Sequence, residues 1–459
     1  MPKSSPPVRP GQILELDVVD LNHAGEGVGK IGSFAIFIPG GLPGERIRAK
    51  IVTLQRNYAR ALLEALLISS ENRTEAPCRH FASCGGCQFQ HLHYREQLHY
   101  KREIVAGTLR RLGGLAIDVL PVLGMKDPWH YRNKAQFPLG MEGKKLRAGF
   151  YKKKTHQIVD LQNCPIQHPL INRTFGIARA LVEKMGIPIY NEKTHWGFLR
   201  HLVVRVSGST GEVLVIPVTN GRDFPQGPAF AKALSARIPS LAGVVQNINT
   251  RRGNYIIGTE NIILWGKSYI TERLGDISYL ISPGSFFQVN SSQAEVLFRQ
   301  VEKYAALSGS ETVYDLYCGT GTIALYLSRR VAKVIGIESF APAVEDARKN
   351  ARLNGVSNAE FFAGPAEEFF PQFVGQGHRP DIVIVDPPRK GCSEKLLTTL
   401  ADAKPKRLIY VSCNPSTLAR DLRFLQDKGY TIHSPVQPVD MFPQTSHVEC
   451  VTLMSKVEK

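Results

Sequence analysis

Three short motifs in the last quarter of the chain carry side chains suited to nucleophilic and acid–base chemistry. They are Asp386-Pro-Pro-Arg-Lys-Gly391, Ser412-Cys-Asn-Pro415 and His447-Val-Glu449. A cysteine thiolate can add covalently to an electron-poor carbon. A carboxylate can then remove a proton from the adduct. The motifs therefore predict covalent addition by Cys413 with proton transfer at a nearby carboxylate.

Each motif lies at or beside an apolar run of the kind that forms a buried strand. A lone cysteine usually packs in a core, and Pro-Pro is an ordinary strand terminator. Cys413, however, lies at a strand-to-loop junction beside Asn-Pro, where core packing is poor. Glu449 is flanked by Val448 and Val451, and burying an idle carboxylate there would be costly. We therefore favour a chemical role for both residues.

A glycine-containing turn, Asp315-Leu-Tyr-Cys-Gly-Thr-Gly321, follows one predicted strand and opens a helix. The next strand ends in Glu338, where an acidic residue binds ribose hydroxyls in doubly wound folds. A dinucleotide-binding loop would have its first glycine where Tyr317 stands. S-adenosylmethionine (SAM) has no pyrophosphate and needs only a tight turn and an acid. The loop therefore favours SAM over a dinucleotide.

A thiolate, a base and a methyl donor together suit methylation of carbon 5 of uracil. The thiolate of Cys413 adds to carbon 6, which makes carbon 5 able to attack the SAM methyl group. Glu449 then removes the carbon 5 proton, while Asp386 or Arg389 holds the uracil edge. A stacked base must be flipped out for this reaction.

Two other functions compete with this interpretation. An enzyme that methylates exocyclic amines needs no cysteine and places an aromatic residue after the double proline, where this chain has Arg389. An RNA-binding or ribosome-assembly factor with a decayed catalytic domain would not need its thiol, acid and cofactor loop intact. Both alternatives are therefore less favoured.

The elements that must position these residues begin near residue 312. Apolar runs at 313–316, 331–337, 381–385 and 408–411 alternate with helical stretches such as 341–353. This alternation predicts a parallel sheet covered on both faces, a Rossmann-like α/β domain. The cysteines Cys318, Cys392 and Cys450 are expected to be buried packing thiols, with Cys450 facing away from Glu449 across its strand.

The N-terminal region predicts a different architecture. Short strands and Gly-rich turns run from about residue 11 to residue 67. Ile47, Ala49 and Ile51 alternate with Arg46, Arg48 and Lys50, which places the apolar set inward and the basic set outward. A small β-barrel with a basic outer face fits this pattern, and such barrels often bind RNA. A helical stretch near 94–112 and a mixed α/β region up to about residue 269 follow.

Four cysteines lie in a pattern typical of metal sites: Cys78, Cys84, Cys87 and the distant Cys164, which precedes a proline. Four thiolates suit an iron–sulfur cluster or zinc. The spacing of five residues and then two is unusual for zinc, which favours paired knuckles. A redox pair at Cys84 and Cys87 is a third interpretation, but no suitable βαβ unit follows it.

The composition sets broad limits on partners and location. The 459 residues are 43% hydrophobic and 21% charged, and the net charge of +17 favours a polyanionic partner such as nucleic acid. No run of about 18 apolar residues predicts a membrane span. Residues 1–10 are polar and Pro-rich and lack the apolar core of a signal peptide, so we expect a cytoplasmic protein.

Taken together, the three catalytic motifs resemble the signature motifs of the bacterial RNA (uracil-5-)-methyltransferase family, and most of all its 23S rRNA branch. The resemblance covers nearly the whole chain. It implies a TRAM-like (OB-like) β-barrel at 8–67, an α+β middle domain with the four-cysteine site at 68–270, and a SAM-dependent methyltransferase domain at 271–459. The tRNA branch usually lacks the barrel and the cysteine cluster. This chain has both, so 23S rRNA is favoured and tRNA is the alternative substrate.

The same resemblance assigns roles to individual residues. It implies that Cys413 is the nucleophile and Glu449 the base. Family contacts to SAM fall on four residues of this chain: Gln288, Tyr317, Glu338 and Asp386. It also implies that Cys78, Cys84, Cys87 and Cys164 bind a [4Fe–4S] cluster. The expected partner is a flipped-out uridine in a single strand or loop of 23S rRNA, and the expected state is a monomer without membrane contact.

Overall fold

The computed structural model describes residues 6–456, and the N-terminal part of this range is a closed β-barrel. Its strands are β1 (Ile13–Leu21), β2 (Glu26–Ile31), β3 (Phe34–Pro39), β4 (Arg46–Leu54) and β5 (Tyr58–Ile68). Ile47, Ala49 and Ile51 are buried in its core, whereas the basic residues between them are exposed, as the alternation predicted.

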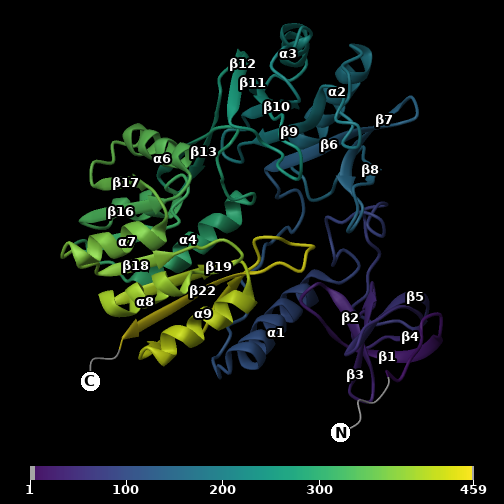
Figure 1. Cartoon of the computed structure of the whole chain (residues 1–459), viewed down its shortest axis with the longest axis horizontal. Helices are drawn as coiled ribbons and strands as arrows, with labels where there is room; N and C mark the ends of the chain where they lie inside the picture. Colours follow the sequence, from purple (N-terminus) through teal and green to yellow (C-terminus); the bar gives the residue numbers. More distant parts are fainter. Residues whose placement is uncertain (1–5, 457–459) are drawn as a thin grey trace.

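The middle part of the chain forms a seven-stranded sheet with strand order β12-β11-β10-β9-β6-β7-β8 (Figure 1). Its strands are β6 (Lys134–Glu142), β7 (Lys145–Tyr151), β8 (Ile158–Asp160), β9 (Leu199–Val206), β10 (Val213–Thr219), β11 (Leu241–Ile248) and β12 (Glu260–Gly266). Helices α2 (Pro169–Lys184) and α3 (Gly227–Ser235) pack on it through apolar side chains such as Phe175 and Phe230. A two-stranded ribbon, β13 (Ile270–Leu274) and β14 (Ile277–Ile281), leads to the next unit.

The C-terminal unit is an eight-stranded sheet with order β17-β16-β15-β18-β19-β22-β20, and β21 pairs with β22. Its strands are β15 (Thr312–Leu316), β16 (Lys333–Glu338), β17 (Ala359–Ala363), β18 (Ile382–Val385), β19 (Arg407–Ser412), β20 (Tyr430–Ile432), β21 (Gln437–Val439) and β22 (Glu449–Lys456). Pairing is parallel from β17 to β19 and antiparallel around β22.

Helices cover both faces of this sheet (Figure 1). They are α4 (Ser291–Ala305), α5 (Thr322–Ser328), α6 (Ala341–Leu353), α7 (Ala366–Gly375), α8 (Glu394–Ala403) and α9 (Pro415–Asp427). Two apolar clusters, one on each face, fill the space between sheet and helices. Cys318, Cys392 and Cys450 are buried in these clusters, as expected of packing thiols.

Helix α1 (Tyr94–Gly113) lies early in the chain but packs against the C-terminal unit. It contacts α9, and its Val105 and Leu109 belong to the same apolar cluster as the sheet residues. The segment after α1 adds parallel bridges from Val119 to Val436 and from Leu123 to Val439. The segment between the barrel and the middle sheet therefore packs against the C-terminal unit, although it comes much earlier in the chain. The domain boundaries at residues 67 and 270 stay predictions, and residues 457–459 of the last domain lie outside the described range.

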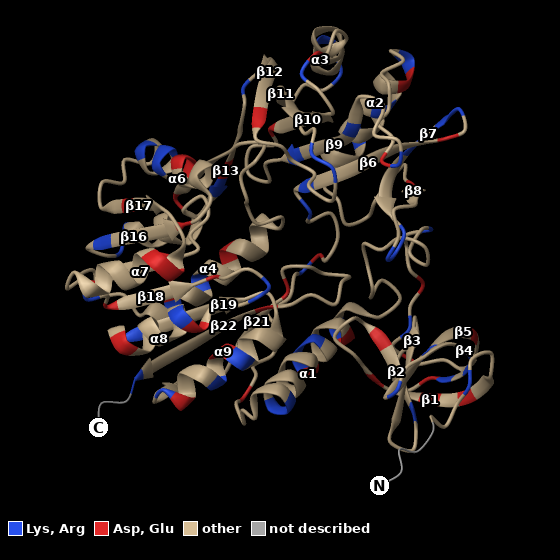
Figure 2. Cartoon of the chain, viewed as in Figure 1, with Lys and Arg blue, Asp and Glu red and all other residues tan. Residues whose placement is uncertain are grey.

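Within residues 6–456, no helix is both long and apolar enough to cross a membrane. Basic residues are spread over the barrel, the middle sheet and the helices of the C-terminal unit (Figure 2). Those of the middle sheet include residues on β6 and β9 (Figure 2).

Candidate active site

A cavity of about 650 Å³ lies at the carboxyl ends of the parallel strands of the C-terminal sheet. This is the edge at which ligands bind in open α/β sheets, because the loops that follow the strands gather there. The cavity brings together six residues that the sequence singled out: Gln288, Tyr317, Glu338, Asp386, Cys413 and Glu449. Further residues of its wall include Phe286, Glu367, Arg389, Phe442 and His447.

Cys413 and Glu449 stand side by side at this edge. Ser412, the last residue of β19, pairs with Cys450 of antiparallel β22. Cys413 is the next residue after Ser412, and Glu449 is the residue just before Cys450, so the two face each other one step further along the ladder. Directly opposed residues in an antiparallel pair have Cβ atoms about 5 Å apart. The sheet register therefore holds the thiol and the carboxyl together.

The electrostatics of the pair follow from burial. Glu449 is only 5% exposed, and burial together with the charge of Asp386 raises its pKa well above the ordinary range of a carboxyl group. Burial likewise raises the pKa of Asp386. Burial, then the charges of Glu449 and Asp386, raises the pKa of Cys413 to about 11, and the charge of Arg389 opposes that rise. Perturbed groups converging in one cleft are typical of a catalytic site.

Arg389 is one of two basic residues, with Lys390, in the wall of the cavity. Its carbonyl oxygen accepts a hydrogen bond from Asn414 Nδ2 at 2.9 Å, which ties the loop after β18 to the loop after β19. Its guanidinium lies 3.3 Å from Nε2 of His447. Asn414 also caps α9 by accepting from the Ser416 backbone N–H. The Ser-Cys-Asn-Pro sequence thus both places the Cys413 thiol at the end of β19 and begins helix α9.

The opposite end of the cavity is formed by the turn after β15. Tyr317 adopts a left-handed backbone conformation (φ 67°), which is uncommon for a residue with a side chain. Its hydroxyl donates a 2.7 Å hydrogen bond to Glu367 Oε1 at the start of α7. Glu338, at the end of β16, accepts from the backbone N–H of Gly319 at 3.2 Å and of Phe340 at 2.8 Å. A tight turn therefore faces two carboxylates.

Gln288 lies on the loop between β14 and α4 and is buried. Its carbonyl oxygen accepts from Asn133 Nδ2 at 3.1 Å. The same loop is held by Ser285, whose hydroxyl donates to Asp346 at 2.5 Å and whose carbonyl oxygen accepts from buried Arg205. The loop is therefore fixed from both the middle sheet and α6, with Gln288 directed at the cavity.

A buried ion pair supports the loop that precedes Glu449. Lys101 of α1 and Asp440 are both fully buried, and Nζ lies 2.5 Å from Oδ1. The ammonium also donates to the carbonyl oxygen of Phe442 at 3.0 Å, and Tyr94 donates to Asp440 Oδ2 at 2.9 Å. Gln97 donates to Gln444 at 2.9 Å. Helix α1 thus fixes the position of Phe442, which lines the cavity.

The four cysteines of the predicted metal site lie near one another. The backbone of Cys84 forms an isolated antiparallel β-bridge with that of Lys152. Cys164 belongs to a small apolar cluster that Cys87 contacts. Burial raises the pKa of Cys87 to about 12, and the charges of Cys164, Cys84 and Cys78 add to that rise. Within residues 6–456, however, no three His, Cys, Asp or Glu side chains form a group close enough to hold a metal ion.

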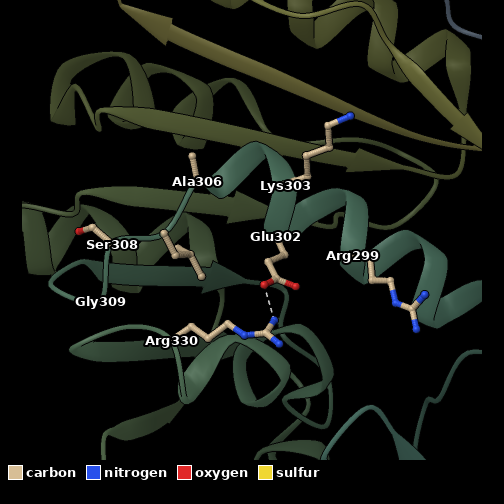
Figure 3. A pocket seen from close by; sticks show the side chains of 8 residues that line it. Arg299, Glu302, Lys303, Ala306, Ser308, Gly309 and Arg330 are labelled. Atoms are coloured by element: carbon tan, nitrogen blue, oxygen red, sulfur yellow. Dashed lines mark ion pairs between the residues drawn. The ribbon is translucent and has the colours of Figure 1, made fainter.

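A second hollow lies at the other end of the same sheet, where α4 ends and the chain enters β15 (Figure 3). Its lining includes Arg299, Lys303 and the ion pair of Glu302 with Arg330. The amino ends of the strands face it, and its lining residues include no cysteine and none of the residues that the sequence motifs singled out. It therefore does not compete with the cavity at Cys413.

Several residues of the cavity carried no signal in the sequence. Glu367 sits in the first turn of a helix, where an acid is ordinary. Phe442 is an aromatic residue in a loop without a motif, and Phe286 lies two residues before Gln288 but was given no role of its own. Only the fold brings them to the wall, and the hydrogen bond from Tyr317 to Glu367 could not be read from either residue alone.

The doubly wound sheet, the tight turn facing Glu338 and the cavity at the strand ends define a SAM-dependent methyltransferase. Two family profiles match the sequence: one described as tRNA (Uracil-5-)-methyltransferase over residues 231–457, and one described as TRAM domain over residues 7–63. The sequence is 45% identical over 455 residues to an uncharacterized RNA methyltransferase of Halalkalibacterium halodurans, covering 99% of each chain. A relative from Clostridium tetani with the same description is 42% identical over 453 residues, covering 99% of this chain and 98% of that one.

A solved structure supports the same conclusion. The tRNA (uracil-54, C5)-methyltransferase of Pyrococcus abyssi, in complex with S-adenosyl-L-homocysteine, superposes with a TM-score of 0.76 at 31% identity. The match covers 96% of this chain and 99% of that one. The chain belongs to the SAM-dependent RNA (uracil-5-)-methyltransferase family, in the form that carries an N-terminal TRAM domain.

Proposed function

We propose that this enzyme methylates carbon 5 of a uridine in 23S rRNA through a covalent bond between Cys413 and carbon 6. The observation that carries the proposal is the position of Cys413 opposite Glu449 in a cavity shared with the cofactor turn. An exocyclic-amine methyltransferase would need neither the thiol nor its carboxyl neighbour.

The reaction uses the thiolate of Cys413, which the charge of Arg389 favours. Its sulfur adds to carbon 6, and the electrons of the carbon 5–carbon 6 double bond move toward the carbonyl at carbon 4. Carbon 5 then attacks the methyl carbon of SAM, whose sulfur leaves with the bonding pair. Glu449 takes the proton from carbon 5, the double bond re-forms, and the thiolate is expelled.

The residues around the pair have separate tasks in this proposal. Asp386 and Arg389, on the loop after β18, hold the uracil edge. Tyr317, Glu338 and Gln288 hold SAM, with the Glu338 carboxylate toward ribose hydroxyls, and Asp386 reaches the same cofactor. Glu449 suits its task because a base with a raised pKa holds the abstracted proton more readily at neutral pH. The uridine enters flipped out of its stack.

The choice of 23S rRNA over tRNA rests on domain content. The TRAM barrel and the four cysteines favour 23S rRNA. The tRNA alternative has an observation of its own, because the match to the Pyrococcus abyssi tRNA enzyme extends over 96% of this chain and so includes most of the barrel region. Domain content therefore does not exclude tRNA.

Mapping of 5-methyluridine decides between the two RNAs. In a strain that lacks this gene, we expect 5-methyluridine to disappear from a site in 23S rRNA and to return with the wild-type gene. A complementing C413A gene serves as the control and should not restore it. Loss confined to tRNA would overturn the rRNA proposal, and loss from neither RNA would overturn the uracil-5 activity itself.

We further propose that Cys78, Cys84, Cys87 and Cys164 bind a [4Fe–4S] cluster. Four thiols from two separate segments fit such a cluster as a donor set, and two of them, Cys87 and Cys164, pack beside Tyr131 and Ile166. They do not form a preset metal-binding group, so binding has to draw them together. The cluster would join the cysteine loop to the segment around Cys164 and would have a structural role.

Anaerobic purification tests the cluster. We expect a brown protein containing iron and acid-labile sulfide, with both lost in the Cys84→Ser variant and kept in the Cys392→Ser control. A colourless protein that contains zinc would contradict the cluster. We also propose that the protein is cytoplasmic, which cell fractionation tests. We propose as well that it is a monomer, which sedimentation of the purified protein tests.

A further inference from the structure

A further cavity of about 550 Å³, distinct from the active-site cavity and from the hollow near Arg299, lies between the cysteine loop, the strands β6 and β9, and the turn that joins β7 to β8. Gly85 and Gly86 form one wall, and the turn from Lys152 to Thr155 forms another. Val289 also lines it. Because Val289 follows Gln288, which lines the active-site cavity, one loop separates the two cavities.

The lining of this further cavity is strongly basic. Arg132, Lys134, Lys152, Lys153 and Lys154 all contribute, and no carboxylate is among its lining residues. Among residues 6–456, neither Arg132 nor Lys134 has an ion-pair partner. Burial and the nearby charges of Arg205 and Arg132 lower the pKa of Lys134 to about 6. An anionic ligand would relieve this accumulation of positive charge.

Two buried polar groups on the wall lack hydrogen-bond partners. Gln167 is 1% exposed and its side-chain oxygen accepts no hydrogen bond. His201 is 6% exposed and its Nδ1 atom has no partner. Buried polar atoms are almost always satisfied in native proteins, and exceptions point to a missing ligand, ion or water. Both residues line the cavity, and rotation of their side chains would turn these covered atoms toward a ligand there.

The walls are held in place from three parts of the chain. The backbone N–H of Gly85 donates to the carbonyl oxygen of Tyr151 at 3.1 Å, and Cys84 forms a bridge with Lys152. Lys153 lies 3.9 Å from Glu26 of the barrel. The β7–β8 turn is thus tied to the cysteine loop and to the barrel, which gives the cavity a defined shape.

We propose that this cavity binds one further nucleotide of the substrate RNA, next to the uridine that is methylated. Arg132 and the lysines of the turn meet its phosphate, and Gln167 and His201 meet the edge of its base. Side-chain amides recognise base edges through paired donor and acceptor atoms. Unstacked bases in single strands and loops are the usual targets of such recognition in RNA. This inference rests on the proposed function, since it needs an RNA substrate with a flipped-out uridine.

The test compares matched variants on one RNA. The substrate is a synthetic RNA fragment centred on the uridine mapped in the deletion strain. We compare the wild type with Gln167→Ala and with the Lys152→Ala/Lys153→Ala pair. The control pair is Lys144→Ala/Lys145→Ala, which removes two equally exposed lysines from the neighbouring β6–β7 turn, outside this cavity.

For both test variants we expect the KM for RNA to rise about tenfold, since one good base or phosphate contact contributes about that much. The KM for SAM should not change, and the control should stay within about twofold of the wild type for both substrates. Melting temperatures identify variants that fail to fold. If Gln167→Ala does not fold, Gln167→Glu, which keeps the side-chain shape, takes its place.

A second measurement places the nucleotide. RNA fragments with an abasic position at each of the neighbours of the uridine are assayed with the wild type and with Gln167→Ala. One abasic position should raise the KM of the wild type about tenfold and change that of the variant little, because the contact is already lost. Folded variants with wild-type KM, or additive effects at every abasic position, would overturn the proposal. A wild type that forms no 5-methyluridine would instead refute the proposed function.

Discussion

Cys413 and Glu449 oppose each other across the β19–β22 ladder, one step beyond the backbone pair Ser412 and Cys450. The paired register ends at Ser412 and Cys450, and Cys413 follows in the bend that leads to α9. A shift of β22 by one residue would turn Glu449 to the other face of the sheet and bring Val448 or Cys450 in its place, depending on the direction of the shift. The catalytic pair therefore depends on the correct pairing of two strands.

Replacement of Cys413 tests the nucleophile. C413A and C413S should both reduce methylation to background while keeping SAM binding, since neither touches the cofactor turn. Wild-type enzyme mixed with SAM and RNA containing 5-fluorouridine should form a complex stable in denaturing gels, because fluorine at carbon 5 cannot leave as a proton does. The C413A enzyme should form none, and turnover by C413A would show that the thiol is not required.

Glu449→Gln should separate activity from stability. Burial and the charge of Asp386 raise the pKa of Glu449 to about 8 from its ordinary value of 4.5. The folded state thus holds this proton more tightly than the unfolded state, so the carboxyl group costs stability as the pH rises from 4.5 through 8. At pH 8 the variant should melt a few degrees higher, on the order of 2–4 °C. At pH 5 the difference should shrink.

The same variant should lose catalysis by about 10²- to 10⁴-fold, the usual contribution of a positioned base. For the wild type, kcat/KM should rise with pH toward 8 as Glu449 ionises. RNA methylated at carbon 5 should stay bound to Cys413 in the variant, and denaturing gels detect this adduct. Equal melting temperatures of the wild type and the Glu449→Gln variant at pH 8 would show that the surroundings of Glu449 do not favour its neutral form.

Two glycines of the cofactor turn should respond differently to alanine. Gly321 (φ +76°) would place a Cβ atom 2.9 Å from the Phe361 ring and 3.1 Å from Ala347. Gly319 (φ +54°) has no heavy atom within 4 Å of such a Cβ. Both variants carry the left-handed strain of about 1–2 kcal/mol. Only Gly321→Ala adds overpacking, about 1–3 kcal/mol. Urea unfolding should give a clearly lower free energy of unfolding for G321A than for G319A. Equal losses of stability in the two variants would contradict the packing argument.

Lys101→Met should lower activity through the loop that carries Phe442. The change leaves Asp440 buried without its cation, which costs about 3–5 kcal/mol in comparable buried pairs. The K101M/D440N double variant keeps an acceptor for Tyr94 and removes the unpaired charge, so it should recover part of the lost stability. Urea unfolding of the two single variants and the double variant measures the coupling. Additive losses would show that the pair does not act as a unit.

Much of the fold follows from local pattern. The run 341–353 is predicted as a helix and forms α6 over Ala341–Leu353. The alternation at Ile47, Ala49 and Ile51 places those side chains in the barrel core, as expected. Periodicity succeeds here because each element buries one face against its own domain. The position of β22 between β19 and β20 could not be predicted, since strand order is set by long-range packing.

The site shows the same division. Motifs at strand ends correctly indicated that Asp386, Cys413 and Glu449 share a cavity, because the ends of neighbouring strands meet at one edge. Glu367 and Phe442 lacked such a signal. Nor does any local pattern place Lys101 of α1 against Asp440, since the two are 339 residues apart. The four cysteines of the proposed cluster illustrate a further limit, because cysteine spacing predicts a donor set and leaves the arrangement of the thiols open.

The contact between Lys101 and Asp440 also bears on how the chain folds. Joining residues so distant in sequence closes a very long loop, and contacts of this kind form late because the entropy of closure must be offset first. The barrel and the middle sheet consist of contacts closer in sequence and can form earlier. The wall around Cys413 should therefore be among the last parts to order, so refolding monitored by hydrogen exchange should protect the barrel well before catalytic competence returns.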